Sequence, residues 1–489
     1  MKQFAPPWLL WSLLVPLALT IIFLVGPVRN VLVVDGGEGA ELSRALFLSH
    51  AAATDRPAPD PTWLYPMLLA AGFKIFGVSA AFARLLTLIS VGALLVALGW
   101  ILRDALGGPG LLIAGILLFS ANGMIGLAAA ARPELPAISL ALVSVALCSR
   151  FSHAPTWKRL SLSGAILACS ILIDPTALII VPAFIVFVFR HLGWESTVRS
   201  FLPWSVGFLA AFAIPVVLAS LNPNRWPHSL VDAAGNSRRL NELLANPGLI
   251  LAAILGAICL IRKKAPAPLL FAAVWLATAM FAAGAAHFRS GPDIIHFYIP
   301  LAVLGATGFV AAARRAGRVF PGGSPGGSSL DGDKINQDRS DGLCALAAIT
   351  IFALWVGFAV PDFVANLTRL DHLRLASRDE LCLSIREHAA ATRWCYTRYP
   401  EYAFAGGVVI PPDLAATASS PSLDAVRQYH PEQMLLDETV ELQNPRWAAW
   451  TTNQYVLVDR DGDKELWISR RLQPRPIQSA HELLQRLGL

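Results

Sequence analysis

The stretch VVDGGEGAELSRAL, residues 33–46, holds the acidic residues that bear most on the fold and function of this chain. It follows the first hydrophobic segment directly, so Asp35 is expected beside a lipid bilayer. A carboxylate is costly to place there and is therefore a functional candidate. A solvated loop residue or a helix cap is the simpler alternative for Asp35 taken alone.

The composition indicates a membrane protein. The 489 residues are 55% hydrophobic and 15% charged, whereas soluble domains carry about 25% charged residues. The net charge of +6 does not indicate nucleic-acid binding, because the basic residues lie mostly in short loops between apolar runs. The first run, 8–28, has Lys2 before it and no small-residue cleavage site after it, so we predict an uncleaved anchor.

The apolar runs predict an α-helical polytopic membrane protein with about eleven transmembrane helices. The candidate spans are 8–28, 79–101, 109–128, 134–150, 160–173, 175–190, 201–220, 247–261, 267–286, 294–313 and 343–361. With the N-terminus in the cytoplasm, the cytoplasmic loops carry Arg103; Arg150, Lys158 and Arg159; Arg190 and Arg199; Arg262, Lys263 and Lys264; and Arg314, Arg315 and Arg318. This arrangement satisfies the positive-inside rule. We expect a bacterial inner-membrane protein whose C-terminal tail is periplasmic.

Composition divides the chain into a transmembrane domain, 1–361, and a C-terminal domain, 362–489. The Gly-, Ser- and Asp-rich segment 318–341 is predicted to be a flexible cytoplasmic linker within the first domain. The tail has the composition of a small soluble α/β domain. Its residues 455–459 and 465–470 flank an Asp-Gly-Asp turn and predict a β-hairpin. Cys382 and Cys395 lie in the tail, where a disulfide and two free thiols are both compatible with the sequence.

Polar residues converge on the predicted periplasmic face. They are Asp35, Glu38, Glu41 and Arg44; Arg132 and Glu134; Asp174; Arg225, His228, Asp232, Arg238 and Arg239; and His287, Arg289, Asp293, His296 and Tyr298. A carboxylate can accept the proton of an attacking hydroxyl or amine, and arginines can bind a phosphate leaving group. This combination suits transfer from a lipid-linked phosphate donor.

Structural roles are alternatives for several of these residues. Glu134 begins a helix after a proline, where an acid favours the helix dipole, and Asp174-Pro175 has the pattern of a helix start. The arginines could bind anionic headgroups without specificity, and His296 and Tyr298 could be interfacial residues at the entrance of a span.

In order and spacing, these motifs resemble the GT-C superfamily of membrane glycosyltransferases, in particular the branch of protein O-mannosyltransferases and lipid A aminoarabinose transferases. That branch has a segment of the form Asp-Glu-x-x-Tyr-Ala-x-x-x-Arg after its first span. The corresponding motifs here are DGGEGAELSR (35–44), PTWLYPMLLAAGFKIFG (61–77), AFARLL (81–86), ARPELPAISLAL (131–142) and GPDIIHFYIPLAVLG (291–305). The resemblance is good over 30–150, weak over 151–320 and absent in the tail.

The resemblance implies that Asp35 and Glu134 are the catalytic acids and that Arg44 and Arg132 contact the donor phosphate. Glu38, Glu41, Arg225, Arg289, His296 and Tyr298 are further candidates for substrate or phosphate binding. The chain departs from the family at Gly36, where the family has its second carboxylate, and at Asp60, near the place of a family lysine. Glu38 or Glu41 could replace the missing carboxylate in space.

We therefore expect a GT-C-type, inverting glycosyltransferase. It would move a sugar from a polyprenyl-phosphate donor to a lipid, glycan or protein acceptor on the periplasmic side. The amphipathic stretch Trp63–Phe76 would lie along the membrane interface. No cofactor is required; a divalent cation is compatible with the site but no residue spacing demands a metal. The alternatives are a lipid or solute transporter or flippase, which would place charges inside its spans, and an inactive GT-C scaffold.

Overall fold

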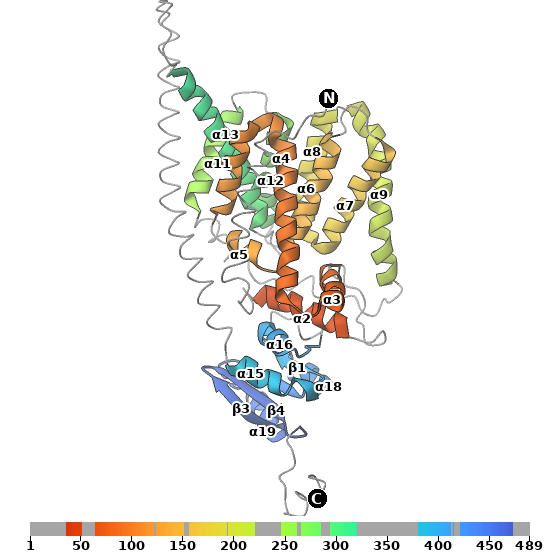
Figure 1. Cartoon of the computed structure of the whole chain (residues 1–489), viewed down its shortest axis with the longest axis vertical. Helices are drawn as coiled ribbons and strands as arrows, with labels where there is room; N and C mark the ends of the chain where they lie inside the picture. The colour runs from red at the N-terminus through yellow and green to blue at the C-terminus, as the bar shows by residue number, and fades with distance from the viewer. Residues whose placement is uncertain are drawn as a thin grey trace, which may run out of the picture.

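The computed structural model describes residues 36–50, 64–121, 124–150, 156–192, 194–220, 246–261, 266–284, 294–319, 380–411, 414 and 421–472. A bundle of long apolar helices forms one part, and the tail forms a smaller α/β part beyond one end of the bundle (Figure 1). The bundle comprises α4 (Ala80–Phe119), α5 (Met124–Ala129), α6 (Glu134–Arg150), α7 (Trp157–Ile173), η2 (Pro175–Ile180), α8 (Val181–Leu192), α9 (Trp194–Ser220), α11 (Pro247–Ile261), α12 (Ala267–Gly284) and α13 (Ile295–Val319).

These helices cover the spans predicted between residues 79 and 313. The predicted spans 8–28 and 343–361 lie outside the described residues, so the total of about eleven is not tested. Within the described part, Ala80–Arg103 alone is both long and apolar enough to cross a membrane by length and composition, and the other apolar helices are shorter. Helix α13 continues to Val319, which is the second residue of the predicted linker 318–341. The rest of that linker lies outside the described residues.

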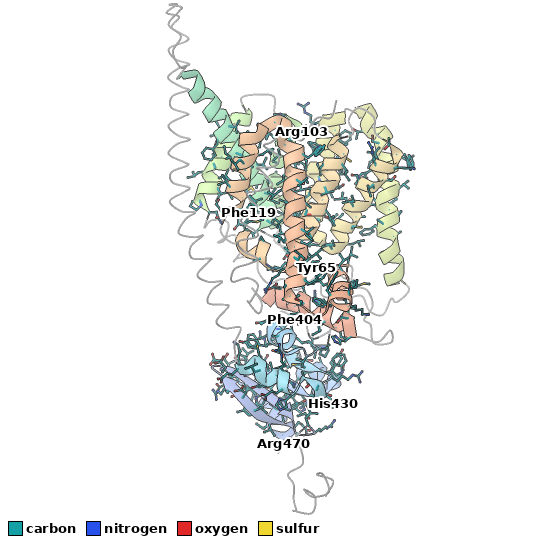
Figure 2. All side chains as sticks on the ribbon, viewed as in Figure 1. Tyr65, Arg103, Phe119, Phe404, His430 and Arg470 are labelled. Carbon is teal, nitrogen blue, oxygen red and sulfur yellow. The ribbon has the colours of Figure 1, made fainter. Side chains whose placement is uncertain are left out.

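The element α4 contains two helices joined by a sharp turn. Gly107 has a φ of 67° and a ψ of −179°, a conformation that glycine adopts without the steric cost of a Cβ. Figure 1 shows the chain reversing direction there, which separates the predicted spans 79–101 and 109–128. Figure 2 places Arg103 at this end of the bundle and Tyr65 at the other. The predicted basic residue Arg103 therefore lies at the end of the bundle away from the tail.

Two pairs of helices approach closely through glycine. A Cβ at Gly164 of α7 would collide with the main chain of Trp204 in α9, and one at Gly207 would collide with Ser161 in return. Helix α11 meets α13 in the same way at Gly256 and the main chain of Leu304. Small residues at such contacts are typical of helices packed inside a membrane, where close van der Waals approach drives association.

Two short helices cover the end of the bundle that faces the tail (Figure 1). They are α2 (Gly36–His50) and α3 (Leu64–Phe76), which pack against each other. Helix α3 buries one side, including Tyr65, Leu69 and Phe73, and exposes Met67, Leu68, Ile75 and Phe76 on the other. An exposed apolar side on a surface helix fits the interfacial role expected for this stretch.

The tail contains a four-stranded sheet in the order β1-β2-β4-β3. The strands are β1 (Cys395–Thr397), β2 (Gln433–Asp437), β3 (Tyr455–Asp461) and β4 (Lys464–Ser469). Strands β1 and β2 are parallel, and β3 with β4 forms the hairpin predicted from the Asp-Gly-Asp turn. The helices are α15 (Glu380–Glu387), α16 (Pro400–Gly406), α18 (Leu423–Tyr429) and α19 (Pro445–Gln454). Cys382 and Cys395 are both buried free thiols, so they form no disulfide here.

Candidate active site at the end of the helical bundle

The site is built around α2, the helix that begins directly after Asp35. Its Glu38 is fully buried, and its carboxylate accepts two hydrogen bonds from the guanidinium of Arg84 in α4, at 2.8 and 3.0 Å. The backbone N–H of Ala131, just before α6, donates a third at 2.9 Å. A paired and hydrogen-bonded carboxylate of this kind is compatible with burial. Glu38 thus anchors α2 to α4 and to the start of α6.

Glu134 and Arg132 lie together at the start of α6. Arg132 Nε is 3.4 Å from Glu134 Oε1, and Glu134 is buried while Arg132 is partly exposed. A Cβ at Gly37 would lie 2.7 Å from the Arg132 guanidinium, so the start of α2 passes close beside this arginine. The structure therefore brings the predicted second acid, its neighbouring arginine and the first turn of α2 into one place.

Asp174 is a third acid of this site. It is buried at the junction of α7 and η2, where its Oδ1 accepts a 2.9 Å hydrogen bond from the Thr176 amide. Burial, followed by the charge of Glu134, raises the pKa of Asp174 to about 6. The sequence predicted a helix start here, and the cap is present. Asp174 therefore lies within electrostatic range of Glu134.

Tyr65 of α3 lies within electrostatic range of Glu38, Glu41 and Glu134. Its side chain is fully buried, and its hydroxyl lies near that of Thr87 without a hydrogen bond of standard geometry to any described residue. Burial raises the pKa of Tyr65, and the charges of Glu41, Glu134 and Glu38 raise it further. The phenol therefore stays neutral and can donate a hydrogen bond into the cluster.

The remaining predicted residues of α2 pair within the helix. Arg44 Nη1 is 2.8 Å from Glu41 Oε1, one turn apart. Asp35, Arg225 and Arg289 lie outside the described residues, so their predicted roles are not tested.

His296 and Tyr298 occupy the first turn of α13 and are both fully buried. The Trp275 indole N–H donates to His296 Nδ1 at 3.2 Å, and the Asn246 side-chain amide donates to the Tyr298 hydroxyl, also at 3.2 Å. Nε2 of His296 has no hydrogen-bond partner among the described residues. Both residues are buried rather than exposed at an interface.

No group of three or more His, Cys, Asp or Glu side chains within the described residues has the arrangement of a metal site.

Sequence reasoning missed Arg84 and Tyr65 as site residues, and it placed Asp174 on the periplasmic face without giving it a role in the site. Arg84 was visible as the single charge in the apolar segment AFARLL, where a charge needs a buried partner. Tyr65 gave no comparable signal, because a tyrosine in an amphipathic stretch has a common structural explanation, and Asp174 before a proline was explained equally well as a helix start.

This chain is similar to known proteins in part of its sequence and in its fold. Residues 58–219 match the family model described as dolichyl-phosphate-mannose-protein mannosyltransferase. The fold is similar to the crystal structure of ArnT from Cupriavidus metallidurans bound to undecaprenyl phosphate, with a TM-score of 0.58 and 14% identity. That match covers 96% of this chain and 100% of ArnT.

The apo form of the same ArnT has a TM-score of 0.58 and 14% identity, covering 93% of this chain and 97% of ArnT. A search of curated proteins found no match. The expected resemblance to GT-C glycosyltransferases is confirmed. The fold similarity extends into the tail, where the sequence showed no resemblance.

Proposed function

We propose that this chain is a membrane glycosyltransferase that takes a sugar from a polyprenyl-phosphate donor. The observation that carries the proposal is the cluster of Glu134, Arg132, Asp174 and Tyr65 beside the start of α2, at one end of a bundle with the ArnT fold. The donor class is supported by the ArnT structure that contains undecaprenyl phosphate. The acceptor is a lipid, glycan or protein hydroxyl or amine.

In the proposed reaction the acceptor oxygen or nitrogen attacks the anomeric carbon of the donor sugar. Asp35 accepts the proton that the acceptor loses, while the bond from the anomeric carbon to the phosphate oxygen breaks. A single displacement of this kind inverts the configuration of the sugar. In the sequence Asp35 precedes α2 directly and stands three residues before Glu38, which anchors α2 to Arg84.

The other site residues bind and orient the substrates. Arg132 and Arg44 stabilise the charge that develops on the leaving phosphate, with Arg225 and Arg289 as additional candidates. Glu134 orients the acceptor or a bound cation, and Glu41 holds Arg44 in place. The neutral phenol of Tyr65 donates a hydrogen bond to a bound oxygen. His296 and Tyr298, in the first turn of α13, are further candidates for substrate binding.

The proposed mechanism uses no cofactor, so sugar transfer that continues in the presence of EDTA would support it. If EDTA stopped the transfer and a divalent cation restored it, the reaction would require a metal. We place the site, the tail and the acceptor on the periplasmic side of a bacterial inner membrane, with the N-terminus in the cytoplasm. The positive-inside rule supports this placement, because the loops predicted to be cytoplasmic are basic and Arg103 lies at the end of the bundle away from the tail.

Mass spectrometry of polyprenyl-phosphate sugars tests the proposal. Envelopes of host cells carrying the wild-type chain would be compared with those carrying Asp35→Asn or Glu134→Gln. Asp104→Asn, next to Arg103 near the end of the first of the two helices in α4, is the matched control for the same loss of charge. We expect one carrier glycolipid to accumulate with Asp35→Asn, to a smaller extent with Glu134→Gln, and not with the control.

Normal expression of all variants without a change in any carrier lipid would contradict the proposal. It would then favour the transporter or the inactive scaffold.

A further inference from the structure

Helix α2 presents different residues to its two neighbours. Glu38, Leu42 and Leu46, spaced four apart, lie on one face and are buried in the bundle. Gly39, Ser43 and Phe47, also spaced four apart, form a second stripe next to the first. We refer to Gly39, Ser43 and Phe47 as the tail-facing stripe.

Each residue of the tail-facing stripe contacts the C-terminal domain. Ser43 Oγ donates a 3.0 Å hydrogen bond to the carbonyl oxygen of Pro400, the first residue of α16. A Cβ at Gly39 would lie 2.8 Å from the Glu401 amide nitrogen, so only glycine allows α16 to approach this closely. The ring of Phe47 stacks on Trp394, with centroids 6.0 Å apart.

A second contact extends the interface to α3. Phe404 of α16 packs against Phe73 of α3, with centroids 6.1 Å apart, and both rings are buried. Figure 2 shows Phe404 between the tail and the end of the bundle where Tyr65 lies. One short helix of the tail therefore touches both helices that cover the candidate site.

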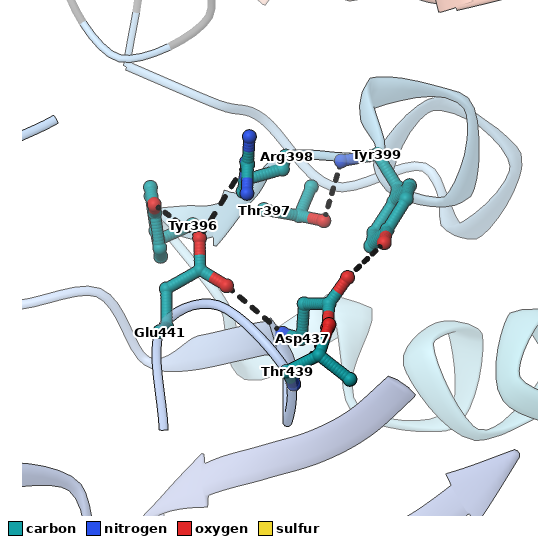
Figure 3. A network of polar contacts seen from close by, with 7 residues as sticks. All are labelled: Tyr396, Thr397, Arg398, Tyr399, Asp437, Thr439 and Glu441. Carbon is teal, nitrogen blue, oxygen red and sulfur yellow. Dashed lines mark hydrogen bonds and ion pairs between the residues drawn. The ribbon is translucent and has the colours of Figure 1, made fainter. Parts of the chain in front are cut away.

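The tail holds α16 rigidly from its own side. The chain enters α16 from β1 through Arg398 and Tyr399, where Tyr399 donates a 2.6 Å hydrogen bond to Asp437 at the end of β2 (Figure 3). Arg398 forms an ion pair with the buried Glu441, which also accepts the Asp437 amide at 3.0 Å. Figure 3 shows these groups joined in one network at the carboxyl ends of the two parallel strands. The sheet thus fixes the start of α16.

We propose that the C-terminal domain is a positioning domain for α2. The tail-facing stripe and Phe404 hold α2 from the side of the tail while the Glu38–Arg84 pair holds it from the bundle, so the first turn of α2 is kept beside Arg132 from both sides. The expected effect on catalysis rests on the proposed glycosyltransferase function, whereas the contact between the tail and α2 does not. Gly39, Ser43 and Phe404 are therefore positioning residues that touch no substrate.

Gly39→Ala tests the proposal in the full-length protein. The added methyl group would meet the main chain of Glu401 and displace α16 from α2. We expect faster hydrogen exchange of the α2 amides, unchanged exchange in β2 and β4, and a fall in kcat of at least tenfold with KM for the lipid donor within about twofold. Gly92→Ala in α4 is the matched control, because a Cβ there meets nothing within 4 Å.

Phe404→Ala and Phe404→Leu form a second pair of variants, in which the sequence of α2 is unchanged. We expect Phe404→Ala to loosen α2 in the same way and Phe404→Leu, which keeps most of the apolar contact, to restore both readouts. Unchanged α2 exchange and unchanged kcat in both Gly39→Ala and Phe404→Ala would overturn the proposal. If the wild-type protein transfers no sugar, the proposed function fails, and the exchange measurement alone then decides whether the tail holds α2.

Discussion

The buried pair of Glu38 and Arg84 offers a sharp test of the structure. Three variants are compared with the wild type: Glu38→Met, Arg84→Met and the double variant. Each single change leaves an uncompensated charge in a place where Glu38 is 0% and Arg84 is 2% exposed. The double change removes both charges and leaves two apolar side chains of similar size.

The expected magnitudes follow from the geometry. Unit charges about 3 Å apart attract by about 5 kcal/mol at an effective dielectric constant of about 20. Removing one partner of a buried pair costs about 3–5 kcal/mol, whereas replacing both by packed apolar groups is often close to neutral. In the double variant the Ala131 amide still loses its acceptor, which costs about 1–3 kcal/mol. The two single effects should therefore exceed the double effect, with a coupling of at least about 3 kcal/mol.

Unfolding by sodium dodecyl sulfate in mixed micelles, followed by the fluorescence of the 14 tryptophans, measures these free energies. Arg103→Met is the control, because Arg103 is exposed at the far end of the bundle and its ring contact with Trp100 is worth at most about 1 kcal/mol. Single variants that cost less than about 1 kcal/mol, or a double variant equal to the sum of the two, would refute the anchoring role of Glu38.

Two further predictions concern Asp174 and the helix contacts. The raised pKa of Asp174 adds stability below about pH 4 that is lost as the pH rises through about 6. The free energy of unfolding of Asp174→Asn should therefore match that of the wild type at pH 4 and exceed it by about 3 kcal/mol above pH 7. Unfolding measured from pH 4 to 8 checks this. Equal stability at all pH values would exclude this burial cost. Gly256→Ala should destabilise the protein by at least about 2 kcal/mol, because the added methyl group meets the Leu304 main chain. The control Gly92→Ala should not destabilise it. Equal melting temperatures for the two variants would contradict the close packing of α11 against α13.

Most of the helical architecture could be predicted from the sequence. Apolar runs between basic loops predicted the helices from 79 to 313, because a bilayer requires continuous apolar segments. The Asp-Gly-Asp turn predicted the β3–β4 hairpin, because turn residues act locally. Glu134 and Arg132 were identified as a pair because they are neighbours in sequence as well as in space.

The remaining part of the candidate site depends on contacts between distant segments. Glu38 meets Arg84 across 46 residues, and Asp174 lies near enough to Glu134 for the two charges to interact. The stacking of Phe47 on Trp394 and the bond from Ser43 to Pro400 join segments more than 340 residues apart.

The sequence by itself determined which segments are apolar, which loops are basic and where turns occur, because these depend on residues close together in the chain. Only the tertiary structure decided which acid is anchored, which acid shares the site with Glu134, and which face of α2 meets the tail. The stability contributed by a buried charge or a close glycine contact depends on the group that it meets, and the fold determines which group that is.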